Sequence, residues 1–150
     1  MLKLSRLTDY AVAALVRLGM ADGVETSPGI AASIGVPEPT VAKVLKALAG
    51  HGLVVSTRGA RGGYRLGKPL SEIPVSEVIF AIDGPIALTS CVEGTGVTCE
   101  SLSLCPVAGR WDPVNEAIRS ALSHISLADM AAASMPRAFR IPAQPINEVA

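Results

Sequence analysis

The sequence is poor in aromatic residues and has no long apolar segment. Its 150 residues include two Phe, two Tyr and one Trp although 49% are hydrophobic, so its core must be built mainly from aliphatic side chains. It contains no run of about 18 uncharged apolar residues, which excludes an ordinary membrane-spanning helix. Lys3, Arg6 and Asp9 lie where a signal peptide needs its apolar stretch. We therefore expect a cytoplasmic protein of one or two small domains, without membrane contact.

Cysteine is also scarce, and all of it lies in one segment. Seven residues separate Cys91 from Cys99, and five separate Cys99 from Cys105. In a reducing compartment an odd number of cysteines argues against a disulfide framework and leaves thiolates free as metal ligands or redox groups. The spacing does not match the C-x-x-C pairs of structural zinc, but it suits a loop around an iron-sulfur cluster. A metal-free thiol regulator is the alternative, because exposed cysteines oxidise reversibly.

The net charge of zero conceals an uneven distribution. Residues 1–68 hold nine Lys and Arg against four Asp and Glu, whereas residues 69–150 hold four against nine. The two halves thus carry charges of about +5 and −5. A basic half indicates a surface that faces a polyanion, with the acidic half turned elsewhere.

Two helices are expected at the start of the basic half. Apolar residues recur at helical spacing over residues 7–18, with Thr8 as the expected N-cap. Ser27 followed by Pro28 is typical of the start of a second, short helix, and Gly35 is typical of its end.

A third helix is predicted from Thr40 to Ala49. Valines and leucines give it one apolar face, and Thr40, Lys43 and Lys46 lie on another. Two helices joined by a tight turn that contains glycine, the second cationic on its outer face, match a helix-turn-helix motif. In that motif the second helix enters the major groove of DNA.

A basic hairpin is predicted to follow. Residues 53–57 and 64–66 are typical of strands, and the turn at 58–63 is rich in glycine. A hairpin after a helix-turn-helix motif is a wing. Its glycines would let the backbone approach phosphates, and Arg58 and Arg61 would reach the minor groove or the DNA backbone.

A single arginine in such a turn is usually only a solvated charge. Here, however, six cations among residues 36–68 are opposed only by Glu38, which favours DNA contact. The predicted DNA-contacting residues are Thr40, Lys43, Lys46, Arg58, Arg61 and Tyr64.

The acidic half is expected to begin with a helix from Val75 that ends at Asp83, directly before the cysteine loop. Asp112 is the expected N-cap of a longer helix that runs to about His124 and carries an aliphatic stripe. In so small a chain the expected partner for this stripe is the same helix of a second copy. The homodimer would supply the symmetry of a palindromic operator. Ser126 is predicted to open a capping box and a brief last helix.

Histidine is rare, with His51 and His124 the only examples. Both stand where helices are predicted to end, so we expect them to interact with helix dipoles rather than to bind metal. No signature of a cysteine hydrolase surrounds any of the cysteines, and we predict that the chain is not an enzyme.

Several segments together resemble a known family. The chain is similar to the IscR/NsrR family of winged-helix regulators, and within it most resembles the regulators of SUF-type iron-sulfur cluster assembly. The resemblance covers roughly residues 1–130, and its most specific part is the R-G-x-x-G-G-Y wing joined to three downstream cysteines. The segments that carry it are LSRLTDYAV, LVVSTRGARGGYRLGKP, VSEVIFAIDGPI and the cysteine loop.

The resemblance implies a homodimer, an iron-sulfur cluster held by Cys91, Cys99 and Cys105, and operator affinity that depends on the cluster. It also implies a fourth ligand, which the partner subunit can supply. Members that resemble IscR itself have a histidine three residues after the last cysteine, where this chain has Ala108. Members that resemble the nitric oxide sensor use an Asp near the start of the first helix, a placement that Asp9 matches.

Asp9 is therefore the leading fourth ligand. Its alternative role is to complement the dipole of the first helix, which is worth about 0.3 to 1 kcal/mol. Glu93 and Glu100 are weaker choices. An oxygen ligand among thiolates would leave one iron labile to oxidants or nitric oxide. We expect a 2Fe-2S cluster, with 4Fe-4S as the alternative.

We thus predict a mainly α-helical fold with a small β-hairpin. It comprises a winged helix-turn-helix DNA-binding region over residues 1–68, a cluster-binding loop and dimerisation helix over residues 69–130, and a disordered tail over residues 131–150. The predicted function is transcriptional control of iron-sulfur cluster assembly genes in response to cluster status or to redox or nitric oxide stress. The alternative is a cluster-free thiol regulator of the same fold.

Overall fold

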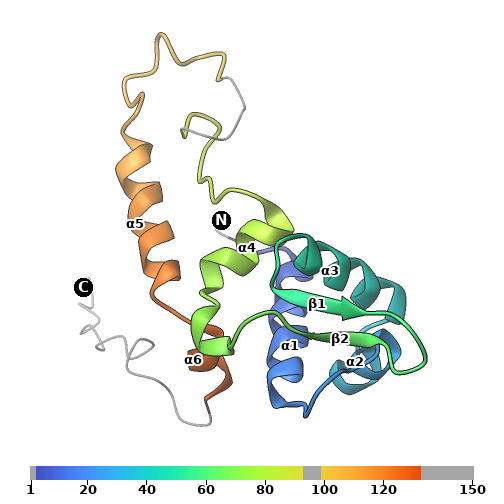
Figure 1. The fold of residues 1–150 in the computed structure, drawn as a ribbon. Coiled ribbons are helices and arrows are strands. Elements are labelled where there is room, and N and C mark those ends of the chain that lie inside the picture. The colour runs from blue at the N-terminus through green and yellow to red at the C-terminus, as the bar shows by residue number, and fades with distance from the viewer. Residues whose placement is uncertain (1–2, 93–98, 133–150) are drawn as a thin grey trace, which may run out of the picture.

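A head of three helices with a two-stranded hairpin at its edge forms one end of the molecule, and a long loop between two further helices forms the other (Figure 1). The structure is a computed structural model and describes residues 3–92 and 99–132. It confirms the predicted mainly helical fold with a small hairpin.

In chain order the elements are α1 (Arg6–Met20), α2 (Ser27–Ile34), α3 (Glu38–Gly50), β1 (Val54–Thr57), β2 (Gly63–Leu66), the 3₁₀ helix η1 (Leu70–Glu72), α4 (Val75–Asp83), α5 (Trp111–Ser123) and α6 (Leu127–Ala131).

The N-cap of α1 is Ser5, so the prediction that Thr8 caps this helix is wrong. The Ser5 hydroxyl accepts a hydrogen bond from the Thr8 backbone N–H at 3.2 Å. Thr8 is fully buried in the first turn, and its own hydroxyl bonds to Asp83, 75 residues further along the chain. A local capping rule takes no account of so distant a partner.

Helices α2 and α3 form the predicted helix-turn-helix. Thr26 rather than Ser27 caps α2, and Gly35 ends it with φ at 69°, in the left-handed region that favours glycine. Helix α3 begins at Glu38, two residues before the predicted start, because Pro39 is tolerated in the first turn of a helix.

The hairpin is antiparallel and is fixed to the head at its base. Val54 lies opposite Leu66, and Thr57 lies opposite Gly63. Tyr64 also exchanges two backbone hydrogen bonds with Glu25, at 2.7 and 2.9 Å, so the connection between α1 and α2 pairs with β2. The wing is thereby held beside the helix-turn-helix.

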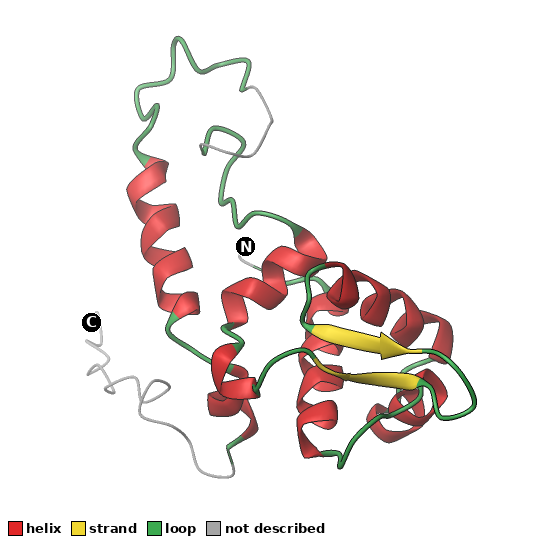
Figure 2. Cartoon of the chain, viewed as in Figure 1, coloured by secondary structure: helices red, strands yellow, loops and turns green. Residues whose placement is uncertain are grey.

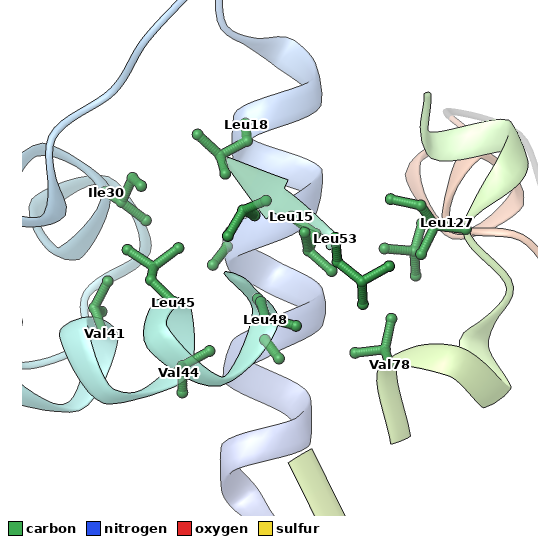
Figure 3. Close-up of a cluster of buried hydrophobic side chains, with 14 of the residues drawn as sticks. Leu15, Leu18, Ile30, Val41, Val44, Leu45, Leu48, Leu53, Val78 and Leu127 are labelled. Carbon is green, nitrogen blue, oxygen red and sulfur yellow. The ribbon is translucent and has the colours of Figure 1, made fainter. Parts of the chain in front are cut away.

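The core is aliphatic, as predicted. Leucines of α1 and α3 interdigitate beside β1, and residues of α4 and α6 close one side of the cluster (Figure 3). Both predicted regions contribute to this single cluster, because Leu127 and Val78 are as fully buried as the leucines of the head. The side chains labelled in Figure 3 are Leu15, Leu18, Ile30, Val41, Val44, Leu45, Leu48, Leu53, Val78 and Leu127.

Helix α5 contributes much less to the core. Only Asn115 of its residues is buried; Ile118 and Leu122 are half-buried, and Val114 is 44% exposed. The helix begins at Trp111, so Asp112 lies inside its first turn rather than at the N-cap. The described part of the α4–α5 connection has neither helix nor strand (Figure 2). The predicted aliphatic stripe therefore remains largely open on a single chain.

The end of the described chain is the short helix α6. Ser126 and Asp129 form the predicted capping box, with their reciprocal hydrogen bonds at 3.1 and 2.9 Å. The predicted disordered tail lies, from residue 133 on, outside the described residues. No helix in the described part of the chain is long and apolar enough to span a bilayer.

Candidate functional site

The outer face of α3 carries three of the predicted DNA contacts. Thr40 is half-buried, and Lys43 and Lys46 are exposed. Their spacing of three residues keeps them on neighbouring positions of one helix face. The opposite face, with Val41 and Leu45 among its members, is buried against α1 and α2. The helix-turn-helix thus presents a cationic surface while its apolar surface holds the head together.

The wing carries the other predicted DNA contacts. Arg58 and Arg61 are exposed in the turn between the strands. Tyr64 is half-buried and packs against the core from β2. The structure also gives the wing glycines a role that the sequence did not reveal. A Cβ atom on Gly63 would collide with the carbonyl group of Glu25, so this glycine allows the wing to lie close to the head.

The cations of α3 and the wing remain available to a polyanion. Within the described residues, Lys43, Lys46, Arg58 and Arg61 form no ion pair. Two other cations of the basic half are neutralised within the chain, as Arg17 pairs with Glu25 at 3.0 Å and Lys68 pairs with Glu77 at 2.7 Å. The positive charge that is left is therefore concentrated on the two elements predicted to contact DNA.

The predicted metal ligands lie on the α4–α5 loop. Cys91, Cys99 and Cys105 are free thiols, and each is partly exposed. The Cys91 Sγ lies 3.1 Å from the Thr89 hydroxyl, whereas the carbonyl groups of Cys99 and Cys105 accept turn hydrogen bonds at 3.2 and 3.3 Å. Over residues 3–92 and 99–132 no group of three Cys, His, Asp or Glu side chains is close enough to hold a metal ion. The single chain does not bring the three sulfur atoms together.

The proposed fourth ligand lies elsewhere. Asp9 is exposed on the first turn of α1 and lines a groove of about 470 Å³ with apolar residues of α1, α2 and α6. The structure does not group it with the cysteines. Of the weaker choices, Glu100 is exposed in the loop, and Glu93 lies outside the described residues.

Both histidines stand at helix C-termini, as predicted. His51 follows α3, and its ring packs edge-on against Phe80 with 5.5 Å between centroids. His124 follows α5, with its Nδ1 atom 2.6 Å from the Ser120 carbonyl oxygen. A protonated imidazole at either position would face the negative end of a helix dipole.

Sequence reasoning missed two polar contacts that hold the start of the cysteine loop. Asn115, buried in α5, donates to the Ile86 carbonyl at 2.8 Å and accepts from the Leu88 N–H at 3.0 Å. Asp83 accepts a hydrogen bond from the buried Thr8 hydroxyl at 2.7 Å. A lone Asn within an aliphatic stripe was the available signal for the first contact. An Asp at a helix C-terminus, where the dipole disfavours it, was the signal for the second.

Comparisons with known proteins agree with this architecture. The profile of the Rrf2 family, described as an iron-dependent transcriptional regulator, matches residues 4–133. The regulator IscR of Photorhabdus laumondii is 36% identical over 123 residues, which cover 81% of this chain and 74% of the relative. The structure of CymR, the global cysteine regulator of B. subtilis, aligns with a TM-score of 0.67 at 27% identity, over 87% of this chain and 97% of that one. T. potens IscR aligns with a TM-score of 0.62 at 30% identity, over 86% and 85%. The predicted resemblance to IscR-type regulators is confirmed, whereas the closer likeness to regulators of SUF-type assembly stays a prediction. The prediction that the chain is not an enzyme is also confirmed, because proteins of this family regulate transcription.

Proposed function

We propose that this chain, which belongs to the Rrf2 family of transcriptional regulators, adjusts its binding to an operator according to the state of its cysteine loop. In the favoured form the loop holds an iron-sulfur cluster, 2Fe-2S before 4Fe-4S, and the regulated genes are those of iron-sulfur cluster assembly. One observation carries the proposal: a single chain combines uncompensated cations on α3 and the wing with three unbridged, partly exposed thiols on one loop.

The head supplies the DNA contacts of the proposed regulator. Thr40 and Lys43, on the outer face of α3, would reach base edges in the major groove and set sequence preference. The other four residues would bind the DNA backbone, which positions the head without reading sequence. These four are Lys46, Arg58, Arg61 and Tyr64.

The donor set of the loop fits an iron-sulfur cluster in kind. Three thiolates from Cys91, Cys99 and Cys105 are the soft ligands that such clusters require, and Asp9 of a second copy would complete the shell. A bound cluster would supply an iron centre that oxidants or nitric oxide can attack at its oxygen-ligated corner. Because the three thiols are not grouped closely enough for a metal ion in the single chain, cluster binding would have to bring their sulfur atoms together.

A second copy is proposed to cover the stripe on α5. A groove of about 850 Å³ lies between residues 3–6, α4, the start of the cysteine loop and α5, and its apolar lining includes Ile79, Leu88, Ile118 and Leu122. The same helix of a partner would cover these side chains, and a two-fold dimer would present two heads to a palindromic operator.

The second candidate is a thiol regulator that binds no metal. The partial exposure of the cysteines favours it, since accessible thiolates oxidise reversibly. The structural similarity to CymR, a global cysteine regulator, also supports it. In this form oxidation of the loop, rather than loss of iron, would change operator binding.

Anaerobic purification separates the two candidates. The cluster form predicts a brown protein with visible absorption bands and stoichiometric iron and sulfide. A colourless, iron-free protein whose operator affinity changes after treatment with hydrogen peroxide would favour the thiol form. A colourless protein whose affinity is insensitive to peroxide would contradict both.

A further inference from the structure

The last residue of α4 is bonded to the first turn of α1. The Thr8 hydroxyl donates to the Asp83 Oδ2 atom at 2.7 Å, and the Ser5 backbone N–H approaches the same oxygen at 3.4 Å. Thr8 is fully buried although it is polar, and its hydroxyl has two partners, the Asp83 carboxylate and, at 3.2 Å, the Ser5 hydroxyl. Only the bond to Asp83 links it to α4. Asp83 is exposed and can move with the loop that follows it.

Asp83 serves α1 rather than its own helix. A carboxylate at the C-terminus of α4 is disfavoured by the dipole of that helix, whereas the same carboxylate beside the N-terminus of α1 is favoured. Partial burial raises the pKa of Asp83, but the hydrogen bonds from Thr8 and Ser5 outweigh this effect and lower the pKa below its usual value. The carboxylate is therefore charged at neutral pH, and the contact is a charge-assisted hydrogen bond.

The same residue is the point at which the cysteine loop leaves the fold. Gly84 follows with φ at 81° and ends α4. The buried Asn115 then holds the backbone of Ile86 and Leu88, and Cys91 lies three residues beyond Leu88. The path from the first cysteine to Asp83 is therefore short and anchored at its midpoint. A displacement at Cys91 would therefore have to reach Asp83 through the segment that Asn115 holds.

On the other side of the contact, α1 is packed against the helix that faces DNA. Leu15 and Leu18 of α1 lie in the same buried cluster as Leu45 and Leu48 of α3 (Figure 3). Because close-packed interiors transmit small displacements, a shift of α1 would be passed on to α3. Thr8 is thus joined to the head by packing and to the loop by one hydrogen bond.

We propose that Thr8 and Asp83 are positioning residues, and that the hydrogen bond between them transmits the conformation of the cysteine loop to α1 and from there to the DNA-binding head. The inference rests on the proposed function only in assuming that loop conformation affects operator binding. A bond that merely stabilised the fold would be equally strong in both states of the loop and would shift no equilibrium between them.

The test compares two defined loop states in reduced, metal-free protein: free thiols and thiols alkylated with iodoacetamide. Hydrogen exchange of the α1 backbone amides and operator affinity are measured for wild type, Thr8→Val, Thr8→Ser and Asp83→Ala. Thr8→Ser keeps the hydroxyl. Asp83→Ala removes the acceptor at an exposed position and remains informative if Thr8→Val fails to fold. Glu72→Ala, which removes an exposed carboxylate from η1, controls for the change in charge.

Alkylation should change α1 amide exchange in wild type by at least about fivefold, within the usual range of coupling between sites. Thr8→Val and Asp83→Ala should each reduce that response to less than about twofold, whereas Thr8→Ser and Glu72→Ala should retain it. No response of α1 in wild type, or an undiminished response in both disrupted variants, would overturn the inference. If α1 responds as expected but operator affinity is the same in both loop states, transmission ends at α1 and the step from α1 to the head is overturned. The proposed function is tested separately, by operator affinity with the cluster present and absent.

Discussion

In the head the large aliphatic side chains are buried, whereas in α5 and the cysteine loop many of them face solvent. Leu15, Leu45 and Leu48 are completely covered, but Leu104 is 89% exposed. The head buries most of its large apolar side chains within one chain. The second region leaves many of them exposed, and its three cysteines are free thiols that are not grouped closely enough to hold a metal ion.

The contrast indicates where each region obtains its final structure. The core of the head is closed with the help of Val78 and Leu127 within the same chain, and the cations of α3 and the wing turn form no ion pair in the described residues, which suits a surface that meets DNA after folding. The loop and α5 combine a partly open apolar stripe with free thiols, and under the proposed function their final arrangement depends on a second copy and on a ligand. A regulator benefits from this division, because the part that senses has to change while the part that reads DNA stays intact.

The largest expected effect concerns α5. Replacing both Ile118 and Leu122 with Asp would place two charges in the proposed interface, where an unpaired buried charge costs several kcal/mol, on the order of 3 to 5. Sedimentation should show monomers that no longer bind a palindromic site. Ser120→Asp adds a charge to the opposite face of the same helix and should leave the dimer intact. A dimer that survives the double substitution would place the interface elsewhere.

The next effect compares the two regions in stability. Leu45→Ala should lower the free energy of unfolding by about 2 to 5 kcal/mol, because it leaves a cavity in the packed head. Leu104→Ala, the same change at an exposed loop position, should alter stability by less than about 0.5 kcal/mol. Urea titrations of the metal-free variants, all at the same protein concentration, measure both changes in the free energy of unfolding. Equal losses would show that the loop is as well packed as the head.

Substitution of the proposed ligands tests which residues of the second region, and of its partner, bind the cluster. Changing Cys91, Cys99 or Cys105 to Ala should remove most of the bound iron, because each deletes a thiolate that the cluster cannot easily replace. Asp9→Ala should be milder, since water or an added thiol can occupy an oxygen-ligand position. Its cluster should show a shifted spectrum and decay faster in air. If Asp9→Ala matches wild type in iron content, spectrum and decay rate, another residue is the ligand.

The smallest effect is expected on the DNA surface of the head. Arg58→Ala or Arg61→Ala should weaken operator binding. If a phosphate contact is lost, the slope of the logarithm of affinity against the logarithm of salt concentration should become shallower by about one unit. Substitution of Thr40 or Lys43 should instead change the preferred base. Titrations at several salt concentrations, on operators with single base changes, distinguish the two roles. An unchanged slope in both arginine variants would exclude the wing as a backbone contact.

The sequence predicted the head well because local patterns encode its elements. The apolar spacing of α3, the glycine that ends α2 and the glycine-rich turn of the wing each act over a few residues. It also predicted the aliphatic stripe of α5, which the described residues cover only in part; that a second copy covers the rest stays a prediction.

Local patterns could not predict the contacts that span the chain. The bond between Thr8 and Asp83 joins residues 75 positions apart, so Thr8 was misassigned as a helix cap. The roles of Asn115 and Gly63 likewise depend on backbone groups brought close only by folding. The arrangement of the cysteines is not encoded locally either, because the proposed site needs a ligand and a second chain.

The most direct test of the account is the operator affinity of one preparation measured with its cluster present and after the iron has been removed under anaerobic conditions. We expect the two forms to differ by about 5- to 150-fold on at least one operator, as is usual for coupled sites. Affinities that are identical for every operator tested would contradict the claim that the state of the cysteine loop controls operator binding by the head.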